Sequence, residues 1–258
     1  MNRTLGYQCP PKGHHALRLA MRGSLTVAAY LPSSVDLRPL CPPVYDQGSL
    51  GSCTAHALVG CVEFLIMRQE RENVPVGIVL RPSRLGLYFD ERNVEGTITT
   101  DAGAVLSDGV SILGRFGWRT EDEWPYDVAR FADFPAGLYI AQRLTSATPL
   151  AHDLDEIRSK LSMGYPIAFG CAVYEQIMDA PNGAIALPGA NDSSIGGHAM
   201  MLVGYRDADA VFVCRNSWNT SWGQDGYGTI PYAYIRDANL TDEIYSTESC
   251  RPVDPGAP

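Results

Sequence analysis

The chain has 258 residues, of which 45% are hydrophobic and 19% are charged. It is therefore long enough to bury a full core, and too apolar to be largely disordered. No apolar run approaches the roughly 18 residues of a membrane span, and a net charge of −9 repels a phosphate backbone. These properties exclude a membrane or a nucleic acid as the principal partner.

The first 34 residues differ in charge from the rest and are predicted to form a leader, 1–34. They contain no acidic residue, which leaves a net charge of −13 for the remainder. The apolar stretch of the leader is too short and broken for a signal peptide, and a transit peptide stays an alternative. A basic leader on an acidic body can fold back onto it. Its basic residues are Arg3, Lys12, Arg18 and Arg22.

Helices are predicted to dominate the next segment, residues 35–150. Apolar side chains recur at helical spacing from Cys53 to about Glu72, which predicts one long amphipathic helix with Cys53 at its N-terminal end. Two more helices are predicted over Arg81–Arg92 and Gly103–Phe116. This half of the chain is expected to carry the nucleophile.

Strands are predicted to dominate the last segment, residues 151–258. One helix around Leu154–Leu161 comes first, and apolar runs typical of strands follow it. Helices first and strands second favour an α+β protein with two lobes. The predicted strands are Pro166–Val173, His198–Tyr205, Val211–Asn216 and Gly226–Tyr232.

Cys53 is the candidate nucleophile. A free cysteine is mostly protonated at neutral pH, so catalysis by a thiol requires that its pKa be lowered. A helix N-terminus supplies positive potential, and a nearby histidine can hold the proton. The preceding run, Asp46–Ser52, is rich in glycine and serine, which suits a tight loop whose backbone amides approach a substrate.

Three motifs, in the right order, resemble the papain family of cysteine proteases. Gln47 stands six residues before Cys53, as in the active-site loop of that family. The run Gly197–Tyr205 is similar to the family's histidine strand and places His198 145 residues after Cys53. An Asn-Ser-Trp segment begins 18 residues later, at Asn216.

This resemblance spans about residues 31–235. It implies a two-lobed α+β fold with a helical N-terminal lobe, an antiparallel β-barrel-like C-terminal lobe and the active-site cleft between them. His198 would take the thiol proton of Cys53, and Asn216 would orient the imidazole. The amide of Gln47 would help to stabilise the oxyanion. Peptide bonds would be hydrolysed through a thioester acyl-enzyme, with no metal or organic cofactor.

The resemblance also implies residues that bind substrate. The backbones of Gly103 and Gly197 are expected to hold an extended peptide, and Trp218 to shield the histidine from water. Gly196 replaces a side chain that narrows the S2 pocket in many relatives, so the P2 preference is expected to differ. We expect a monomer that acts on peptide or protein substrates, with residues 1–30 crossing its own cleft and restraining it.

Several positions depart from the family pattern. Leu50 stands where a disulfide-forming cysteine is usual, and Thr54 where an aromatic residue is usual. His56 stands where phenylalanine is common, and no second pair of ligands accompanies it to make a metal site. The departures indicate a variant, bacterial branch. Seven cysteines leave at least one thiol free if the others pair, and the count leaves the compartment open.

Two other functions remain open at this point. An amidase or transpeptidase that acts on cell-wall peptides could use the same residues. A binding module could have kept the scaffold and lost turnover, although the intact set of four polar residues speaks against that.

Overall fold

The three-dimensional structure is a computed structural model. It describes residues 3–11, 30–72, 80–135, 139–140 and 142–252. Three of the four basic leader residues, Lys12, Arg18 and Arg22, lie outside the described residues. No helix in the part of the chain that is described is long and apolar enough to cross a membrane.

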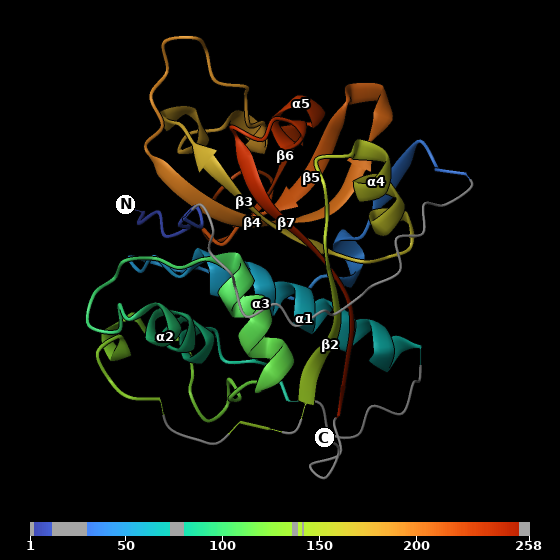
Figure 1. Cartoon of the computed structure of the whole chain (residues 1–258). Coiled ribbons are helices and arrows are strands. Elements are labelled where there is room, and N and C mark those ends of the chain that lie inside the picture. Colours follow the sequence, from blue (N-terminus) through green and yellow to red (C-terminus); the bar gives the residue numbers. More distant parts are fainter. Residues whose placement is uncertain (1–2, 12–29, 73–79, 136–138, 141, 253–258) are drawn as a thin grey trace.

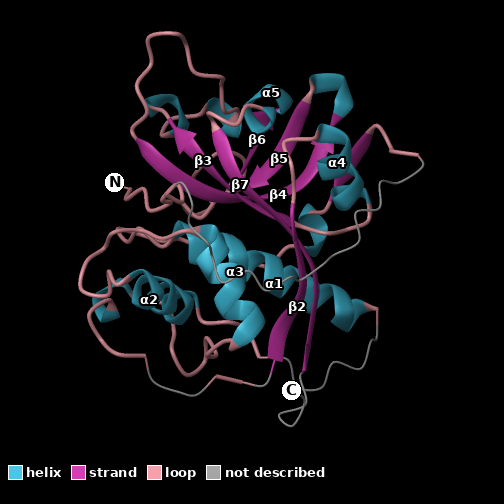
Figure 2. Ribbon diagram, viewed as in Figure 1, coloured by secondary structure: helices cyan, strands magenta, loops and turns pink. Residues whose placement is uncertain are grey.

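One antiparallel sheet of seven strands makes up most of one half of the structure, and two of its strands, 142–149 and 241–252, extend beside the helices of the other half (Figures 1 and 2). The strands are β1 (Ser34–Asp36), β2 (Gln142–Pro149), β3 (Ile167–Val173), β4 (Gly196–Arg206), β5 (Val211–Arg215), β6 (Tyr227–Pro231) and β7 (Thr241–Pro252). Their order in the sheet is β2-β7-β3-β4-β5-β6, and β1 pairs with β4. β4 is almost entirely buried and lies in the middle of this order.

Three helices pack together in the other half, below the sheet in Figure 1, and two shorter helices lie beside the strands. They are α1 (Cys53–Arg71), α2 (Arg84–Glu95) and α3 (Leu106–Arg115), with α4 (Leu154–Ser162) and α5 (Tyr232–Arg236) near the sheet. Single turns of 3₁₀ helix occur at Arg38–Leu40, Val128–Arg130, Glu175–Ile177, Pro181–Gly183 and Asp207–Asp209. α1 is buried over most of its length. It packs against β4 on one side and against α2 and α3 on the other, so it lies between the two halves.

The start of α2 is set by a capping side chain, whereas α1 starts without one. α2 starts at Arg84 and not at the predicted Arg81, because the hydroxyl of Ser83 accepts the N–H of Gly86 at 2.9 Å. α1 starts at Cys53 as predicted, with no acidic residue in its first turn. The positive end of α1 therefore stays uncompensated beside the candidate nucleophile.

Glu243 of β7 caps α3 from the other half of the molecule. Its carboxylate accepts the N–H of Leu106 at 3.0 Å and of Ser107 at 3.1 Å. α3 therefore starts at Leu106, three residues after the predicted Gly103. A charged acceptor that satisfies two orphan N–H groups is a strong cap, and here it joins the helices to the sheet.

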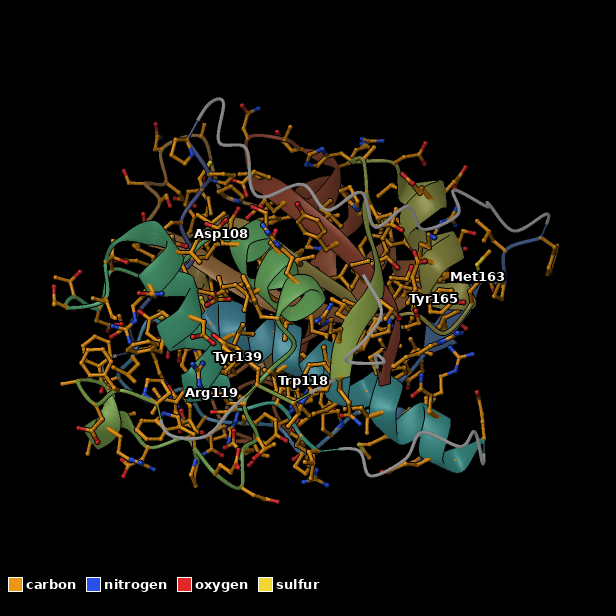
Figure 3. All side chains as sticks on the ribbon, turned by 60° about the horizontal axis from the view of Figure 1, so that its bottom comes forward. Asp108, Trp118, Arg119, Tyr139, Met163 and Tyr165 are labelled. Carbon is orange, nitrogen blue, oxygen red and sulfur yellow. The ribbon has the colours of Figure 1, made fainter. Side chains whose placement is uncertain are left out.

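A second connection lies at the far end of α1. Arg68 donates to the carbonyl oxygens of Met163 and Gly164 at 3.2 and 2.9 Å, and its guanidinium lies 5.6 Å from the ring centre of Tyr165. Figure 3 shows Met163 and Tyr165 beside this helix end.

Two aromatic side chains, Trp118 and Tyr139, make polar contacts near the start of β2. Trp118 donates its indole N–H to the carbonyl of Leu80 at 2.8 Å. The guanidinium of Arg119 lies 4.2 Å from the ring centre of Tyr139, and Figure 3 shows these two side chains next to each other.

The sheet contains strands that the sequence analysis did not predict. β1 pairs with β4 through Val35 and Tyr205, so residues 34–36 lie on the sheet although the predicted helical lobe begins at residue 35. β2 pairs over its length with residues 245–252 of β7, and the first part of β7 pairs with β3. β2 and β7 are rich in polar side chains, so their strand character comes from pairing and not from an apolar pattern.

Candidate active site

Cys53 lies at the N-terminus of α1, and its side chain is 0% exposed. Burial raises the pKa of its thiol to about 12, although backbone N–H groups of Ala199, Gly6 and Thr54 bond to it and act in the opposite direction. Ala199 is the strand residue directly after His198. The structure therefore brings the predicted nucleophile to the part of β4 that carries the predicted base.

His198 and Asn216 form a hydrogen-bonded pair, with 2.8 Å between Nε2 and Oδ1. The same Oδ1 accepts the backbone N–H of Ser217 at 2.7 Å, which only an oxygen can do. Nε2 must therefore carry the proton that it donates to Asn216, which leaves Nδ1 as an acceptor. Nδ1 is buried and has no hydrogen-bond partner among the described residues.

His198 is fully enclosed, with 0% exposure. Burial lowers the pKa of His198 to about 4, and the bond to Asn216 only partly opposes this. The imidazole is therefore neutral and able to accept a proton. A neutral thiol and a neutral imidazole are the resting forms in this closed site.

Trp218 covers the histidine. Its ring lies 4.6 Å from that of His198, tilted by 31°, and Trp222 packs edge-on against it at 6.1 Å. The backbone carbonyl of Trp218 accepts a guanidinium N–H of Arg3 at 3.0 Å. The residue thus shields the histidine and also touches the leader.

Gln47 presents its side-chain N–H groups to the cleft. Its Oε1 accepts the hydroxyl of Ser217 at 2.6 Å, which fixes the orientation of the amide. Nε2 donates to the carbonyl of Leu50 at 2.9 Å and to that of Thr4 at 3.0 Å. The predicted oxyanion donor is therefore engaged by a carbonyl of the leader.

Two residues that support this loop were missed by the sequence analysis. Tyr126 donates to the carbonyl of Gln47 at 2.8 Å and lies 2.7 Å from the hydroxyl of Ser52. The carboxylate of Asp101 accepts the N–H of Gly51 at 3.0 and 3.1 Å. Both lie in the stretch between the first helices and the strands, where no local pattern predicts a contact with the loop.

Residues 3–11 of the leader lie between the helices and the sheet, which Figure 1 shows as the N-terminal trace, and Tyr7 forms a parallel β-bridge with Ala104. Tyr7 donates its N–H to the carbonyl of Gly197 at 3.1 Å. Ala104 donates to the carbonyl of Gly6 at 2.7 Å and accepts the N–H of Gln8 at 2.8 Å. The segment is thereby hydrogen-bonded to both walls of the cleft.

The approach is close enough to require glycine on both sides. A Cβ atom on Gly6 would lie 1.8 Å from the carbonyl oxygen of Gly51. A Cβ atom on Gly103, where φ is +79°, would lie 2.0 Å from the carbonyl oxygen of Gly6. Any larger residue at either position would push the leader out of the cleft.

The predicted substrate-binding residues all lie along this path, with one difference in detail. Gly197 accepts a backbone hydrogen bond from Tyr7 of the leader. Gly103 only makes the close approach, and the hydrogen bonds come from its neighbour, Ala104. Gly196 faces the side chain of Leu5, since a Cβ there would lie 3.0 Å from it.

The other sequence departures are structural. His56 is buried, and its Nδ1 lies 2.9 Å from the carbonyl oxygen of Ser52, near the site but not in it. All seven cysteines are described, and all are free thiols. Within the described residues no group of three His, Cys, Asp or Glu side chains could hold a metal ion.

Comparisons with known proteins identify the family of this chain and its fold. The family described as papain family cysteine protease matches residues 102–247. An uncharacterized peptidase C1-like protein of Acanthamoeba polyphaga mimivirus is 33% identical over 215 residues, which are 78% of this chain and 68% of that protein. A cathepsin B-like protein of Giardia intestinalis, CP2, is 27% identical over 88% of this chain and 77% of its own.

Among solved structures, xylellain, a cysteine protease from Xylella fastidiosa, superposes with a TM-score of 0.80. The two chains are 33% identical, and the match covers 97% of this chain and 96% of xylellain. The predicted two-lobed α+β fold is thereby confirmed. The chain belongs to the papain family of cysteine proteases and is a cysteine-type peptidase that acts on peptide substrates.

Proposed function

We propose that Cys53, His198, Asn216 and Gln47 carry out the peptidase reaction of this chain and that its own leader restrains them. Cys53 attacks the scissile carbonyl, and His198 takes the thiol proton at Nδ1 and returns it to the leaving amine. Asn216 holds the imidazole in the required tautomer. The Gln47 amide and the backbone N–H of Cys53 stabilise the oxyanion, at roughly 3 kcal/mol for each donor.

One observation carries this proposal: the buried, unpartnered Nδ1 of His198. The bond from Nε2 to Asn216 leaves Nδ1 as the proton acceptor. A buried polar atom without a hydrogen-bond partner costs free energy of folding, so such an atom calls for a functional explanation. Ala199, the next residue along β4, contacts the Cys53 sulfur through its N–H. The Cys53 sulfur therefore lies against the strand position directly after His198.

The proposed restraint rests on what the leader occupies. Its backbone takes the hydrogen bonds of Ala104 and Gly197, and the carbonyl of Thr4 takes a donor of Gln47. The covered Cys53 and His198 are excluded from water, which favours their neutral forms. Removal of the leader would admit water and favour the thiolate-imidazolium pair.

The residue roles are tested by labelling with an epoxysuccinyl inhibitor and reading the mass shift on Cys53, followed by cleavage of a peptide library. Labelling with cleavage supports the assignment. Labelling without cleavage of any peptide would favour a specialised amidase or transferase that uses the same residues.

The restraint is tested by comparing the full chain with a chain that begins at Leu31 and with the full-length Gly6→Val variant. Both changes are expected to raise the rate of peptide cleavage, because each removes the leader from the cleft. Gly189→Val, in an exposed loop, is the matched control. Equal rates for all four proteins at matched concentration would remove the idea of restraint.

The division into a leader (1–34), a helical lobe (35–150) and a β-rich lobe (151–258) and the monomeric state are part of the same proposal. The contacts of residues 3–11 with both walls of the cleft support a leader that docks within its own chain. Sedimentation at increasing concentration tests the monomer, since an oligomer would gain mass.

A further inference from the structure

Arg3 is the leader residue with the most specific polar environment. One guanidinium nitrogen pairs with the carboxylate of Asp46, and the other donates to the carbonyl of Trp218 at 3.0 Å. The side chain of Arg3 is 11% exposed and that of Asp46 is 35% exposed. A fork that reaches a carboxylate and a carbonyl at once matches the geometry of guanidinium and not that of a lysine ammonium.

The acceptors are held in place by the body of the protein and not by the leader. Asp46 accepts the N–H of Gly48 at 2.9 Å and the side-chain amide of Asn219 at 3.4 Å. Asn219 is itself fixed by a backbone bond to Tyr45 at 3.0 Å. Asp46 and Trp218 also form a β-bridge with each other. The two acceptors therefore keep their spacing when Arg3 leaves.

Asp46 is charged, and its partner Arg3 lies at the edge of a cavity. Burial tends to raise the pKa of Asp46, but Arg3 and the Gly48 N–H outweigh this and lower the pKa, so the group is a carboxylate at neutral pH. Arg3 and Trp218, but not Asp46, line a cavity of about 310 Å³. The carboxylate of Asp179 also lines this cavity. The lining residues are Arg3, Met178, Asp179, Trp218, Ser221 and Trp222.

Removal of the leader leaves Asp46 without the cation that it pairs with here. The cleft that the leader vacates is the one that a peptide substrate enters. The two acceptors adjoin the candidate catalytic residues, because Trp218 packs on His198 and Asp46 directly precedes Gln47. An arginine carried by the substrate would find the same two acceptors at the same spacing.

We infer that Asp46 and the Trp218 carbonyl form a guanidinium subsite, which takes an arginine side chain of a peptide substrate once Arg3 has left. The inference rests on the proposed function and adds a substrate class to it. In the resting chain, Arg3 fills the subsite in place of that side chain.

Peptide binding tests the subsite without relying on turnover. The full-length chain carries Arg3→Ala and Gly6→Val to open the cleft, and Cys53→Ala to prevent cleavage. Fluorescent decapeptides of one neutral background carry a single arginine at successive positions, each matched by a peptide with neutral citrulline. At one position we expect arginine to bind about fivefold more tightly than citrulline, as for a partly exposed, charge-assisted pair.

The added Asp46→Asn substitution is expected to bring this ratio to about one, because the amide still accepts the Gly48 N–H but carries no charge. Asp36→Asn is the matched control, since Asp36 pairs with Arg38 on an exposed surface, and it is expected to keep the ratio. Equal binding of arginine and citrulline peptides at every position would overturn the inference. So would a preference that survives Asp46→Asn, or a failure of every peptide to bind.

The two proposals fail in different ways. If arginine is preferred through Asp46 but the protein with Cys53 intact cleaves nothing, the subsite stands and the catalytic assignment fails. If peptides are cleaved with no preference for arginine over citrulline, the catalytic assignment stands and the subsite is only an anchor for the leader.

Discussion

Two buried histidines, His56 on α1 and His198 on β4, are nearly equivalent in isolation and differ in their surroundings. Burial lowers the pKa of both, to about 3 and about 4, and each has one unpartnered ring nitrogen. In His198 the bonded nitrogen is Nε2, held by Asn216. In His56 it is Nδ1, held by the carbonyl of Ser52.

The difference shows that the neighbours of a histidine, and not its burial or pKa, decide its chemistry. The carbonyl of Ser52 can only accept, so His56 keeps its proton on Nδ1. The ring of His56 meets that of Tyr126 edge-on at 4.6 Å and offers its free nitrogen to no polar group in the described structure. His198 offers its free nitrogen beside a strand position that contacts the Cys53 sulfur.

Replacing each histidine in turn gives the largest expected contrast. His198→Ala is expected to lower kcat/KM about 10⁴-fold, because it removes the only acceptor for the thiol proton. His56→Phe is expected to keep kcat/KM within about threefold, because the aromatic contact with Tyr126 remains. Steady-state kinetics on the Gly6→Val background measure both. A loss for His56→Phe as large as that for His198→Ala would erase the distinction.

The partner of each histidine gives the next largest contrast. Asn216→Ala is expected to lower kcat about 100-fold with little change in KM, because the Nε2–H then lacks the acceptor that selects its tautomer. Ser52→Ala leaves in place the backbone carbonyl that accepts the His56 proton, so kcat is expected to change by only about twofold. Comparable losses in the two variants would contradict the proposed role of Asn216.

The acid sensitivity of stability tests whether His56 is buried in its neutral form. The pKa of His56 falls from 6.5 to about 3 on folding, so the unfolded chain binds the extra proton between those values. Stability is therefore lost as the pH falls below 6.5. His56→Phe is expected to reduce the loss between pH 7 and pH 5 by about 1 to 2 kcal/mol. Urea denaturation at both pH values measures this, and an unchanged loss would show that His56 is not buried in the neutral form.

The smallest expected effect is the influence of the His56 region on the active-site loop. Tyr126→Phe keeps the ring against His56 but removes the donor to the Gln47 carbonyl. About a fivefold decrease in kcat is expected, the value of one ordinary hydrogen bond, with KM unchanged. An increase in KM alone would instead assign Tyr126 to substrate binding.

The sequence predicts the residues that come in motifs and misses those defined by distant contacts. The resemblance to the motifs of the papain family predicts Cys53, Gln47, His198 and Asn216, and the apolar period predicts α1. The contact between Ser217 and Gln47 joins residues 170 positions apart, so no local pattern announces it. Their roles in the reaction stay predictions for the experiments above.

The limits of the predicted elements have the same cause. α3 begins where Glu243 caps it, and that carboxylate comes from a strand more than 130 residues further along the chain. β2 and β7 have too few apolar residues to be predicted alone, and each is stabilised by pairing with the other. Periodicity in the sequence indicates which face of an element is buried. The start of α3 and the two strands depend instead on contacts with residues far away in the sequence.

The cap that Glu243 places on α3 bonds the helical half of the molecule to the sheet. Helices and sheet are bonded to each other there and, at the far end of α1, through Arg68. Spreading the halves to release the leader would expose a carboxylate and two amides at once, a cost of several kcal/mol. The leader is therefore expected to leave, and a peptide to enter, without separation of α3 from β7.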